Sequence, residues 1–246
     1  MGQISPDDFP AATARPGRWR AGSYEPRGMW GAPDSHTLNP DLIVCRDPLD
    51  PRTEQLRALR TRLLNHWSNP DGARRALAIV SPNSREGRSY LAANLAVLFA
   101  QLGHRTLLID ADLRAPRQFE LFNVHNRLGL AAVLAGRLGR EAAVAVPAFG
   151  PLFVLPAGTV SPNPPELLLR PALSAFVRFV DGLYDVILLD SPPARRHADA
   201  QDVAFSAGSA LVLARAGHTR VDETAGTVQA LGEGGVRVLG TVLNVF

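Results

Sequence analysis

The chain has 246 residues, a formal net charge of +3 and an apolar fraction of 46%, which suits one sizeable domain with a tail or two small domains. Every basic residue is an arginine, and the arginines are spread along the chain, so nucleic-acid binding is not indicated. The single cysteine, Cys45, excludes an internal disulfide or a cysteine metal cluster, and the lack of a long apolar run or a leader pattern predicts a soluble, cytoplasmic protein.

The N-terminal segment, residues 1–45, differs in composition from the rest of the chain. It is rich in Pro, Gly, Asp and Arg and shows no sustained apolar periodicity. A segment of this composition buries too little apolar surface to fold by itself. We therefore predict a disordered or loosely packed tail over 1–45 and one domain over 46–246.

Beyond the tail, a first helix is followed by alternating strands and helices. The stretch TEQLRALRTRLLNHW, 53–67, has leucines at helical spacing, and NPDG at 69–72 is a stop signal. The strands expected after it are apolar on both faces, which is typical of a parallel sheet covered by helices on both sides. The expected strands are 76–80, 105–110, 152–156, 184–190, 209–216 and 236–244, and the expected helices are 89–103, 171–183 and 221–232.

The stretch SPNSREGRSYLAANLA, 81–96, joins the first strand to a helix. Loop amides and a helix N-terminus in such a unit attract an anion, and Ser89 has the position at which phosphate loops hold Mg²⁺. The match is incomplete, because Pro82 stands where the pattern has glycine and Arg88 where it has lysine. An ordinary turn between strand and helix remains the alternative on this stretch alone.

Two further motifs place carboxylates at the ends of apolar strands: LLIDADLR carries Asp110 and Asp112, and VILLDSPP carries Asp190. Burying a carboxylate costs free energy unless a cation binds to it. In parallel sheets, ligands bind at the carboxyl ends of the strands. We predict that Asp110 and Asp112 hold Mg²⁺ or its waters and that one accepts a hydroxyl proton, while Asp190 meets Mg²⁺. A strand-end cap and a turn are the alternative roles of Asp110 and Asp112.

In this order, the three motifs resemble the P-loop, Walker A′ and Walker B motifs of the bacterial tyrosine kinases of exopolysaccharide and capsule synthesis. The resemblance covers about residues 48–246, and it is strongest to the chain-length-determinant tyrosine kinases. It includes EQLRALR, which matches the family's E-x-x-R-x-x-R oligomerisation motif, and the segment 155–168. It implies a P-loop NTPase-like fold with a parallel sheet and helices on both faces.

The resemblance also implies a site for ATP and Mg²⁺. Asp110 and Asp112 would organise Mg²⁺ and activate the incoming tyrosine hydroxyl, and Asp190 would complete the metal shell with Ser89. The residues implied to wrap the nucleotide phosphates are Ser84, Arg85, Glu86, Gly87, Arg88, Ser89 and Tyr90, with Arg88 as the catalytic cation.

The first helix carries Glu54, Arg57 and Arg60, which the resemblance implies pair across subunits in a homo-oligomeric ring. Considered without the resemblance, they are a solvated helix face on which Glu54 and Arg57 pair for a few tenths of a kcal/mol.

The chain departs from the family pattern at three places. Arg88 is a larger, planar cation than lysine, so we expect ATP binding to persist with reduced or altered turnover. Ser84 and Arg85 stand where Pro-Gly is common, and Tyr90, which replaces threonine, either packs or contacts the base or sugar. The family's C-terminal tyrosine cluster is absent, so the acceptor is another protein or phosphorylation is marginal.

The leading hypothesis is an ATP-dependent cytoplasmic protein-tyrosine kinase that regulates exopolysaccharide chain length and export. We expect a separate membrane chain-length regulator, a polysaccharide co-polymerase, to anchor it at the inner membrane and activate it. One alternative is a non-catalytic ATP-binding assembly regulator of a membrane polysaccharide polymerase, which Arg88 and the missing tyrosines favour. Another is a partitioning-type ATPase, which ranks last because Asn83 and its neighbours lack the extra lysine of that loop.

Overall fold

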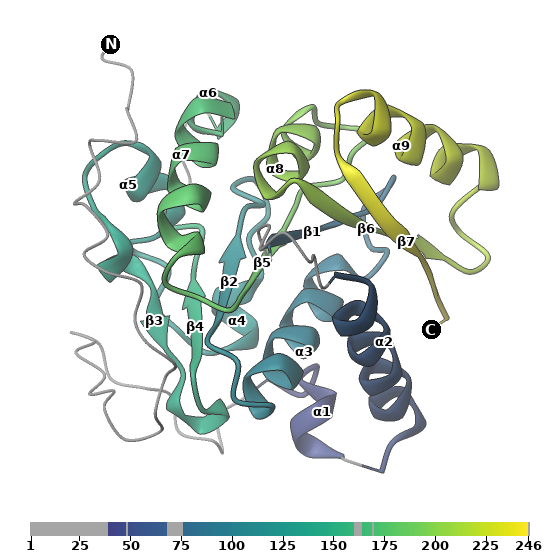
Figure 1. Ribbon diagram of the computed structural model, residues 1–246, viewed down its shortest axis with the longest axis horizontal. Helices are drawn as coiled ribbons and strands as arrows, with labels where there is room; N and C mark the ends of the chain where they lie inside the picture. Colours follow the sequence, from purple (N-terminus) through teal and green to yellow (C-terminus); the bar gives the residue numbers. More distant parts are fainter. Residues whose placement is uncertain (1–38, 48, 68–75, 160–163, 169, 246) are drawn as a thin grey trace.

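The structure, a computed structural model, describes residues 39–47, 49–67, 76–159, 164–168 and 170–245. A seven-stranded sheet with the order β3-β4-β2-β5-β1-β6-β7 runs through the molecule (Figure 1). Its strands are β1 (Ala76–Val80), β2 (Thr106–Asp110), β3 (Val144–Ala145), β4 (Leu152–Leu155), β5 (Val186–Asp190), β6 (Ser209–Arg215) and β7 (Arg237–Asn244).

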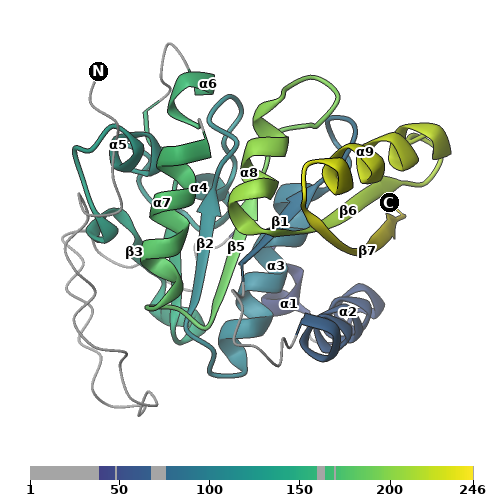
Figure 2. The same cartoon turned by 45° about the horizontal axis from the view of Figure 1, so that its top comes forward.

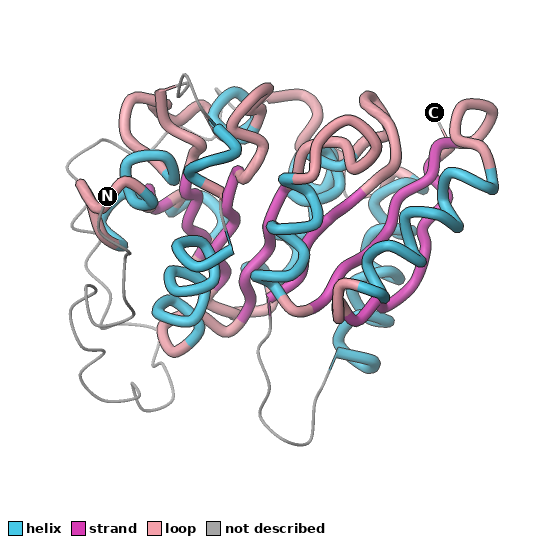
Figure 3. Tube along the Cα trace, turned by 90° about the horizontal axis from the view of Figure 1, so that it is seen from above, coloured by secondary structure: helices cyan, strands magenta, loops and turns pink. Residues whose placement is uncertain are grey.

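Helices cover both faces of this sheet, as Figure 2 and the view from above in Figure 3 show. One face carries α2 and α3, and the other carries α7, α8 and α9. The helices are α1 (Ile43–Arg46), α2 (Pro51–Trp67), α3 (Arg88–Gln101), α4 (Gln118–Leu121), α5 (Leu130–Leu134), α6 (Pro164–Leu167), α7 (Arg170–Asp181), α8 (Asp199–Ala207) and α9 (Val221–Glu233), with 3-10 turns η3 (Arg140–Ala142) and η4 (Pro147–Phe149). In the described part of the chain, no helix has the length and apolar character needed to span a membrane.

The central strand β1 shows why the core has two layers. Successive side chains of a strand point to opposite faces. Accordingly, Ala76 and Val80 pack in the cluster that includes α7 and α8, whereas Leu77 and Ile79 pack in the cluster that includes α2 and α3. All of β1 is buried. Because both of its faces contact a core layer, every residue of the strand has to be apolar.

The predicted parallel sheet is confirmed for most of the strands, with one exception at an edge. The sheet is not wholly parallel, because the two-residue β3 pairs antiparallel with β4 at one edge. All other neighbouring strands are parallel. The segment before β4 folds back directly onto it, and a short return of this kind does not need the crossover that a parallel neighbour requires.

The helix α3 follows the loop that leaves β1, and it is buried on nearly all sides beneath β1, β2 and β5. Its sequence is rich in alanine and leucine, which favour helix and fit a close approach to the sheet. A helix that is buried all round is fixed in place. The loop at its N-terminus is therefore held by the core on both ends.

The predicted first helix is confirmed as α2, with Leu56, Leu63 and Trp67 buried. The NPDG stop at 69–72 lies outside the described residues, as do residues 1–38 of the predicted tail. The described end of that tail is not loosely packed: Leu42 is fully buried, and the Asn94 amide of α3 donates to the Asp41 carbonyl at 2.9 Å. The packed domain therefore begins a few residues before the predicted boundary at 46, because the apolar residues 42–44 join its core.

Candidate functional site

The three sequence motifs meet on three adjacent strands. In the sheet, β5 lies between β1 and β2, and its last residue, Asp190, pairs with Asp110 of β2 and Ile79 of β1. The phosphate-type loop leaves the end of β1 and leads into α3. The structure thus brings together the strand ends that the sequence predicts to converge.

A glutamine joins the two strand-end carboxylates. The Gln118 main-chain N–H donates to Asp110 Oδ2 at 2.9 Å, and its side-chain Nε2 donates to Asp190 Oδ2 at 2.8 Å. The Arg117 N–H donates to the same oxygen of Asp110 at 3.0 Å. Each carboxylate is therefore fixed through one oxygen.

The other oxygens of this group have no hydrogen-bond partner. Asp110 Oδ1, Asp190 Oδ1 and Gln118 Oε1 are buried and unpartnered, and they are half of the six such side-chain atoms in the described residues. Buried polar atoms nearly always have a partner in native proteins. Three acceptor oxygens without donors, on residues linked to one another, suit a hard divalent cation such as Mg²⁺.

Burial also raises the pKa of both carboxyls. For Asp190, burial raises the pKa to about 6, against the opposing effects of the Ser89 hydroxyl, Arg88 and Gln118. For Asp110, burial is again the largest cause, and the neighbouring Asp190 raises the pKa further. A bound dication would favour the ionised form of both groups.

Besides burial, the charge of Asp112 raises the pKa of both Asp110 and Asp190, although Asp112 has hydrogen-bond partners of its own. Its Oδ1 accepts the N–H groups of Arg114 at 3.2 Å and Ala115 at 3.0 Å, which closes a turn after β2. The turn that the sequence offers as the alternative role is therefore present. These bonds use Oδ1, so Oδ2 remains to accept a proton or a metal-bound water.

Arg88 is bound into its own loop. Its Nη1 donates to Ser81 Oγ and, at 2.6 Å, to the Asn83 carbonyl, while Nε donates to the Ser191 carbonyl at 2.8 Å. The residue is only 8% exposed. These three bonds tie the two ends of the loop to the end of β5, and they leave Nη2 as the part of the guanidinium that can reach phosphate without breaking one of them.

The loop backbone turns through two left-handed residues, Arg85 with φ 61° and Gly87 with φ 98°. Glycine adopts this region freely, whereas an L residue pays about 1 kcal/mol or more. Arg85 stands where the resembled family has glycine, so the structure locates that departure at a strained position.

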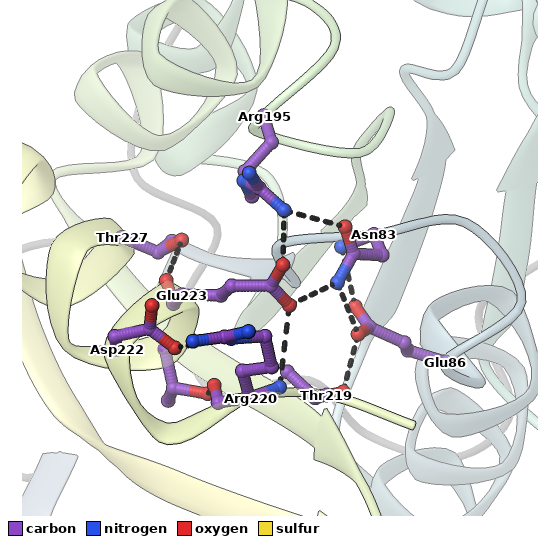
Figure 4. Close-up of polar contacts among 9 residues, drawn as sticks. Asn83, Glu86, Arg195, Thr219, Arg220, Asp222, Glu223 and Thr227 are labelled. Carbon is purple, nitrogen blue, oxygen red and sulfur yellow. Dashed lines mark hydrogen bonds and ion pairs between the residues drawn. The ribbon is translucent and has the colours of Figure 1, made fainter.

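The side chain of Glu86 lies in a polar network with Asn83 and Thr219 (Figure 4). Its carboxylate accepts the Asn83 N–H at 2.6 Å and the Thr219 hydroxyl, and it is fully buried. Asn83 Nδ2 also donates to Glu223 at the start of α9 at 2.8 Å. Any phosphate contact by Glu86 therefore falls to its main-chain N–H.

The remaining predicted loop residues lie as follows. Ser84 and Ser89 are half-buried, and the Ser89 hydroxyl faces Asp190, whose pKa it lowers. Tyr90 lines a groove of about 1150 Å³ between α2 and β7, and its hydroxyl is buried without a partner. Both roles that the sequence left open for Tyr90, packing and a base or sugar contact, stay predictions.

On α2, Glu54 and Arg57 form an ion pair of 3.3 Å between Oε2 and Nη1. Burial, followed by the charge of Arg57, lowers the pKa of Arg60, and its Nε is buried without a partner. The three residues lie on one helix, and the pairing across subunits stays a prediction.

Sequence reasoning missed Gln118, Thr219 and Glu223. Gln118 could have been noticed because it follows LLIDADLR by four residues, within reach of the same strand end. Thr219 and Glu223 carry no such signal, since they are distant in sequence from the loop that they contact. Within the described ranges, no group of three or more His, Cys, Asp or Glu side chains is placed to hold a metal, so the donor set needs Gln118 and Ser89.

Known proteins resemble this chain in sequence. A model of the CobQ/CobB/MinD/ParA nucleotide binding domain matches residues 77–246. Tyrosine-protein kinase YwqD of Bacillus subtilis (strain 168) is 34% identical over 204 residues, which are 83% of this chain and 85% of that protein. Tyrosine-protein kinase Etk of Escherichia coli (strain K12) is 33% identical over 208 residues, or 85% of this chain, but the chain spans only 28% of the length of Etk.

Solved structures resemble it in fold. The kinase domain of Etk matches with a TM-score of 0.79 and 32% identity, over 85% of this chain and 81% of that domain. The septum site-determining protein MinD of Pyrococcus horikoshii, solved with Mg-ADP, matches with a TM-score of 0.62 and 26% identity, over 69% of this chain and 70% of that one. The predicted P-loop NTPase-like fold is confirmed by these likenesses.

Proposed function

Because the chain belongs to the CobQ/CobB/MinD/ParA nucleotide-binding family and, within it, to the bacterial tyrosine-protein kinases, we propose that it transfers the γ-phosphoryl group of ATP to protein tyrosine. The observation that carries the proposal is the pair Asp110 and Asp190, whose free oxygens are buried beside a phosphate-type loop. An ATP-binding role also agrees with the Mg-ADP complex of the related MinD.

The residues divide into two roles. Asp110, Asp190 and Ser89 would hold Mg²⁺, which when bound neutralises charge on the transferring phosphate. Main-chain N–H groups of the loop, with the start of α3, would receive the phosphates. In the transfer, the bond between the γ-phosphorus and the ADP oxygen breaks, a bond to the tyrosine oxygen forms, and the hydroxyl proton passes to Asp112 Oδ2.

The cellular role that we propose is control of exopolysaccharide chain length and export, which rests on the likeness of the motifs to the chain-length-determinant kinases. A membrane chain-length regulator would anchor the cytoplasmic kinase at the inner membrane and activate it. Glu54, Arg57 and Arg60 would join subunits in a ring, and the exposure of Glu54 supports this role, since its side chain is 75% exposed.

A second candidate is a non-catalytic, ATP-binding assembly regulator. The engagement of Arg88 favours it, because a cation held by bonds to Ser81, Asn83 and Ser191 is less available to the transferring phosphate. The two candidates differ in one measurable product, which is phosphotyrosine.

Radiolabelled ATP separates them. The purified chain, with and without the cytoplasmic segment of a candidate membrane regulator, is incubated with Mg²⁺ and γ-labelled ATP and analysed for phosphotyrosine. We expect labelling that is lost in Asp110→Ala and Asp190→Ala. Mg²⁺-dependent ATP binding without labelling would support the assembly regulator, and full ATP affinity in both variants would contradict the assignment of the site.

A further inference from the structure

The buried amide of Gln118 is the unexplained group nearest the strand ends. Gln118 is fully buried, although glutamine is mostly an exposed residue. It lies on the four-residue helix α4, four residues after the predicted motif LLIDADLR. Neither burial nor helix formation requires an amide here, so the reason for it must lie in its contacts.

The orientation of the amide follows from chemistry. Nε2 lies 2.8 Å from Asp190 Oδ2 and 3.2 Å from the Ser89 carbonyl, and both of these are acceptors. Only the NH₂ group can satisfy two acceptors, so the amide has one acceptable orientation. The carbonyl oxygen Oε1 is consequently the atom turned away from them, and it is buried without a partner.

A buried carbonyl oxygen without a hydrogen-bond donor costs free energy unless a donor or a cation binds to it. The two carboxylates to which Gln118 is bonded each have one oxygen in the same condition. When both carboxyls are ionised, all three oxygens are acceptors, so they cannot satisfy one another. A hydrated divalent cation would satisfy all three, since carboxylate, carbonyl and water oxygens are the ligands that Mg²⁺ and Mn²⁺ prefer.

We propose that Gln118 belongs to the cation shell of the nucleotide site: its NH₂ and N–H groups fix Asp190 and Asp110, and its Oε1 accepts from a metal-bound water or binds the metal directly. This inference rests on the proposed function and extends it to a residue that the loop and strand motifs do not contain. Gln118 is in this respect both a positioning residue and an oxygen donor.

Two substitutions test the two halves of this role. Gln118→Met keeps the length of the side chain but removes both the NH₂ donor and the oxygen. Gln118→Glu keeps an oxygen at the same reach and adds a negative charge, but it also replaces the NH₂ donor to Asp190 Oδ2 and the Ser89 carbonyl by an oxygen. Gln229→Met is the matched control, because Gln229 is an exposed glutamine whose Nε2 bonds Glu233 on α9 at 2.8 Å.

The measurement is Mn²⁺ binding to the full chain at saturating ADP, followed by electron paramagnetic resonance, together with ADP binding in excess EDTA. We expect Gln118→Met to weaken Mn²⁺ binding about 10- to 100-fold and to leave metal-free ADP binding within about twofold, as a loss confined to the metal shell requires. Gln118→Glu keeps an oxygen ligand with added charge, which raises metal affinity, but it loses the NH₂ donor that fixes Asp190, so it should bind Mn²⁺ more tightly than Gln118→Met. Gln229→Met should change neither value.

Equal Mn²⁺ affinity in Gln118→Met and the wild type would overturn the inference, as would a loss of ADP affinity that is the same with and without metal. If Gln118→Met does not fold, Gln118→Leu takes its place, because it also removes both the NH₂ donor and the oxygen, and Mn²⁺ affinity equal to that of the wild type counts against the role. A wild type that labels tyrosine while Gln118→Met matches its Mn²⁺ affinity leaves the kinase proposal standing and rejects only this inference. A wild type that binds no Mn²⁺·ADP overturns both.

Discussion

At the scale of single residues, Asp190 couples stability to pH. Burial raises its pKa from 3.8 to about 6, so the folded protein keeps a proton that the unfolded chain loses. The contribution of Asp190 to the stability of the metal-free protein is therefore greatest below pH 4. This contribution is lost as the pH rises through about 6. The loss at neutral pH is about 3 kcal/mol.

We accordingly expect Asp190→Asn to raise the melting temperature of the metal-free protein at pH 7.5 and to flatten its dependence on pH between 4 and 8. Thermal melts in EDTA across that range measure both. Glu233→Gln, which changes an exposed carboxylate at the end of α9, is the control and should keep the wild-type slope. An Asp190→Asn slope equal to the wild-type slope would show that Asp190 ionises normally.

Arg88 supports a second prediction at this scale. Arg88→Met removes the N–H groups that donate to Ser81 Oγ and to the Asn83 and Ser191 carbonyls. Leaving a buried acceptor without its donor costs about 1–3 kcal/mol of stability. Arg88→Lys retains a cation with fewer donors, so it should lose less stability. Urea denaturation measures the difference, with Arg62→Met on the exposed side of α2 as the control.

The same two variants distinguish two roles of Arg88, which are stabilisation of the loop and binding of phosphate. If Arg88 mainly braces the loop, Arg88→Lys lowers the urea midpoint and does not weaken ADP binding by more than a few-fold. A lysine variant that is as stable as the wild type and turns over faster would instead show that the guanidinium's loop bonds matter little.

At the scale of elements, α9 is tied to the phosphate-type loop through Glu223. Its Oε2 accepts from Asn83 Nδ2 at 2.8 Å, and its Oε1 pairs with Arg195 (Figure 4). The Asn83 bond is the first cause of the lowered pKa of Glu223. The start of α9 therefore helps to hold a loop that lies more than a hundred residues away in sequence.

We expect Glu223→Ala to weaken ADP binding several-fold, because Asn83 and, through it, the Glu86 carboxylate lose a fixed neighbour. Isothermal titration with and without Mg²⁺ is the measurement. Asp222→Ala is the matched control: it removes an acidic residue from the same turn of α9, and the bond of Asp222 is to Arg220 rather than to the loop. Equal ADP affinity in the two variants would argue against the coupling.

The elements also show what the sequence can and cannot predict. The six long strands agree with their apolar runs to within two residues at each end. For the inner strands the reason is that a strand buried on both faces must be apolar throughout, whereas the edge strand β7 is only partly buried. The helix α8, Asp199–Ala207, escaped prediction because its short alanine-rich run follows a Pro-Pro pair. The helix α4 has only four residues and is fixed by bonds to Asp110, which no local pattern reveals.

The same contrast holds for the site. The ends of β1, β2 and β5 meet because parallel strands end at one edge of the sheet, and sequence order alone predicts this. The engagement of Arg88 and Glu86 within the loop depends on Ser191 and Thr219, which are about a hundred residues away or more. The direction of a side chain at such a contact depends on tertiary packing, so the sequence of the motif does not predict it.

At the scale of the whole molecule, the fold limits which tyrosine can receive phosphate. The Tyr90 hydroxyl is buried, and Tyr184 precedes β5 at the end opposite to Asp190. With about 3.3 Å per strand residue, Tyr184 lies roughly 20 Å from Asp190. Burial of the Tyr90 hydroxyl and the distance of Tyr184 therefore both disfavour phosphorylation by their own chain.

We therefore expect phosphopeptide mass spectrometry after incubation with Mg·ATP to find no phosphate on Tyr90 or Tyr184, and to find it on an added protein acceptor. Tyr90→Phe and Tyr184→Phe should leave the labelling of that acceptor unchanged. Strong phosphorylation of Tyr184 would mean that subunits exchange substrates across an interface, or that this end of the sheet opens.

The contact between α2 and α3 has a practical consequence. Trp67, at the end of α2, is 5% exposed and packs edge-to-face on Phe99 of α3, with 6.0 Å between ring centroids. The other two tryptophans of the chain, Trp19 and Trp30, lie in the N-terminal segment. In a chain shortened to begin near residue 39, Trp67 would be a natural fluorophore, and its emission would report without any label whether the helix that bears Glu54, Arg57 and Arg60 leaves the core when copies of the chain associate.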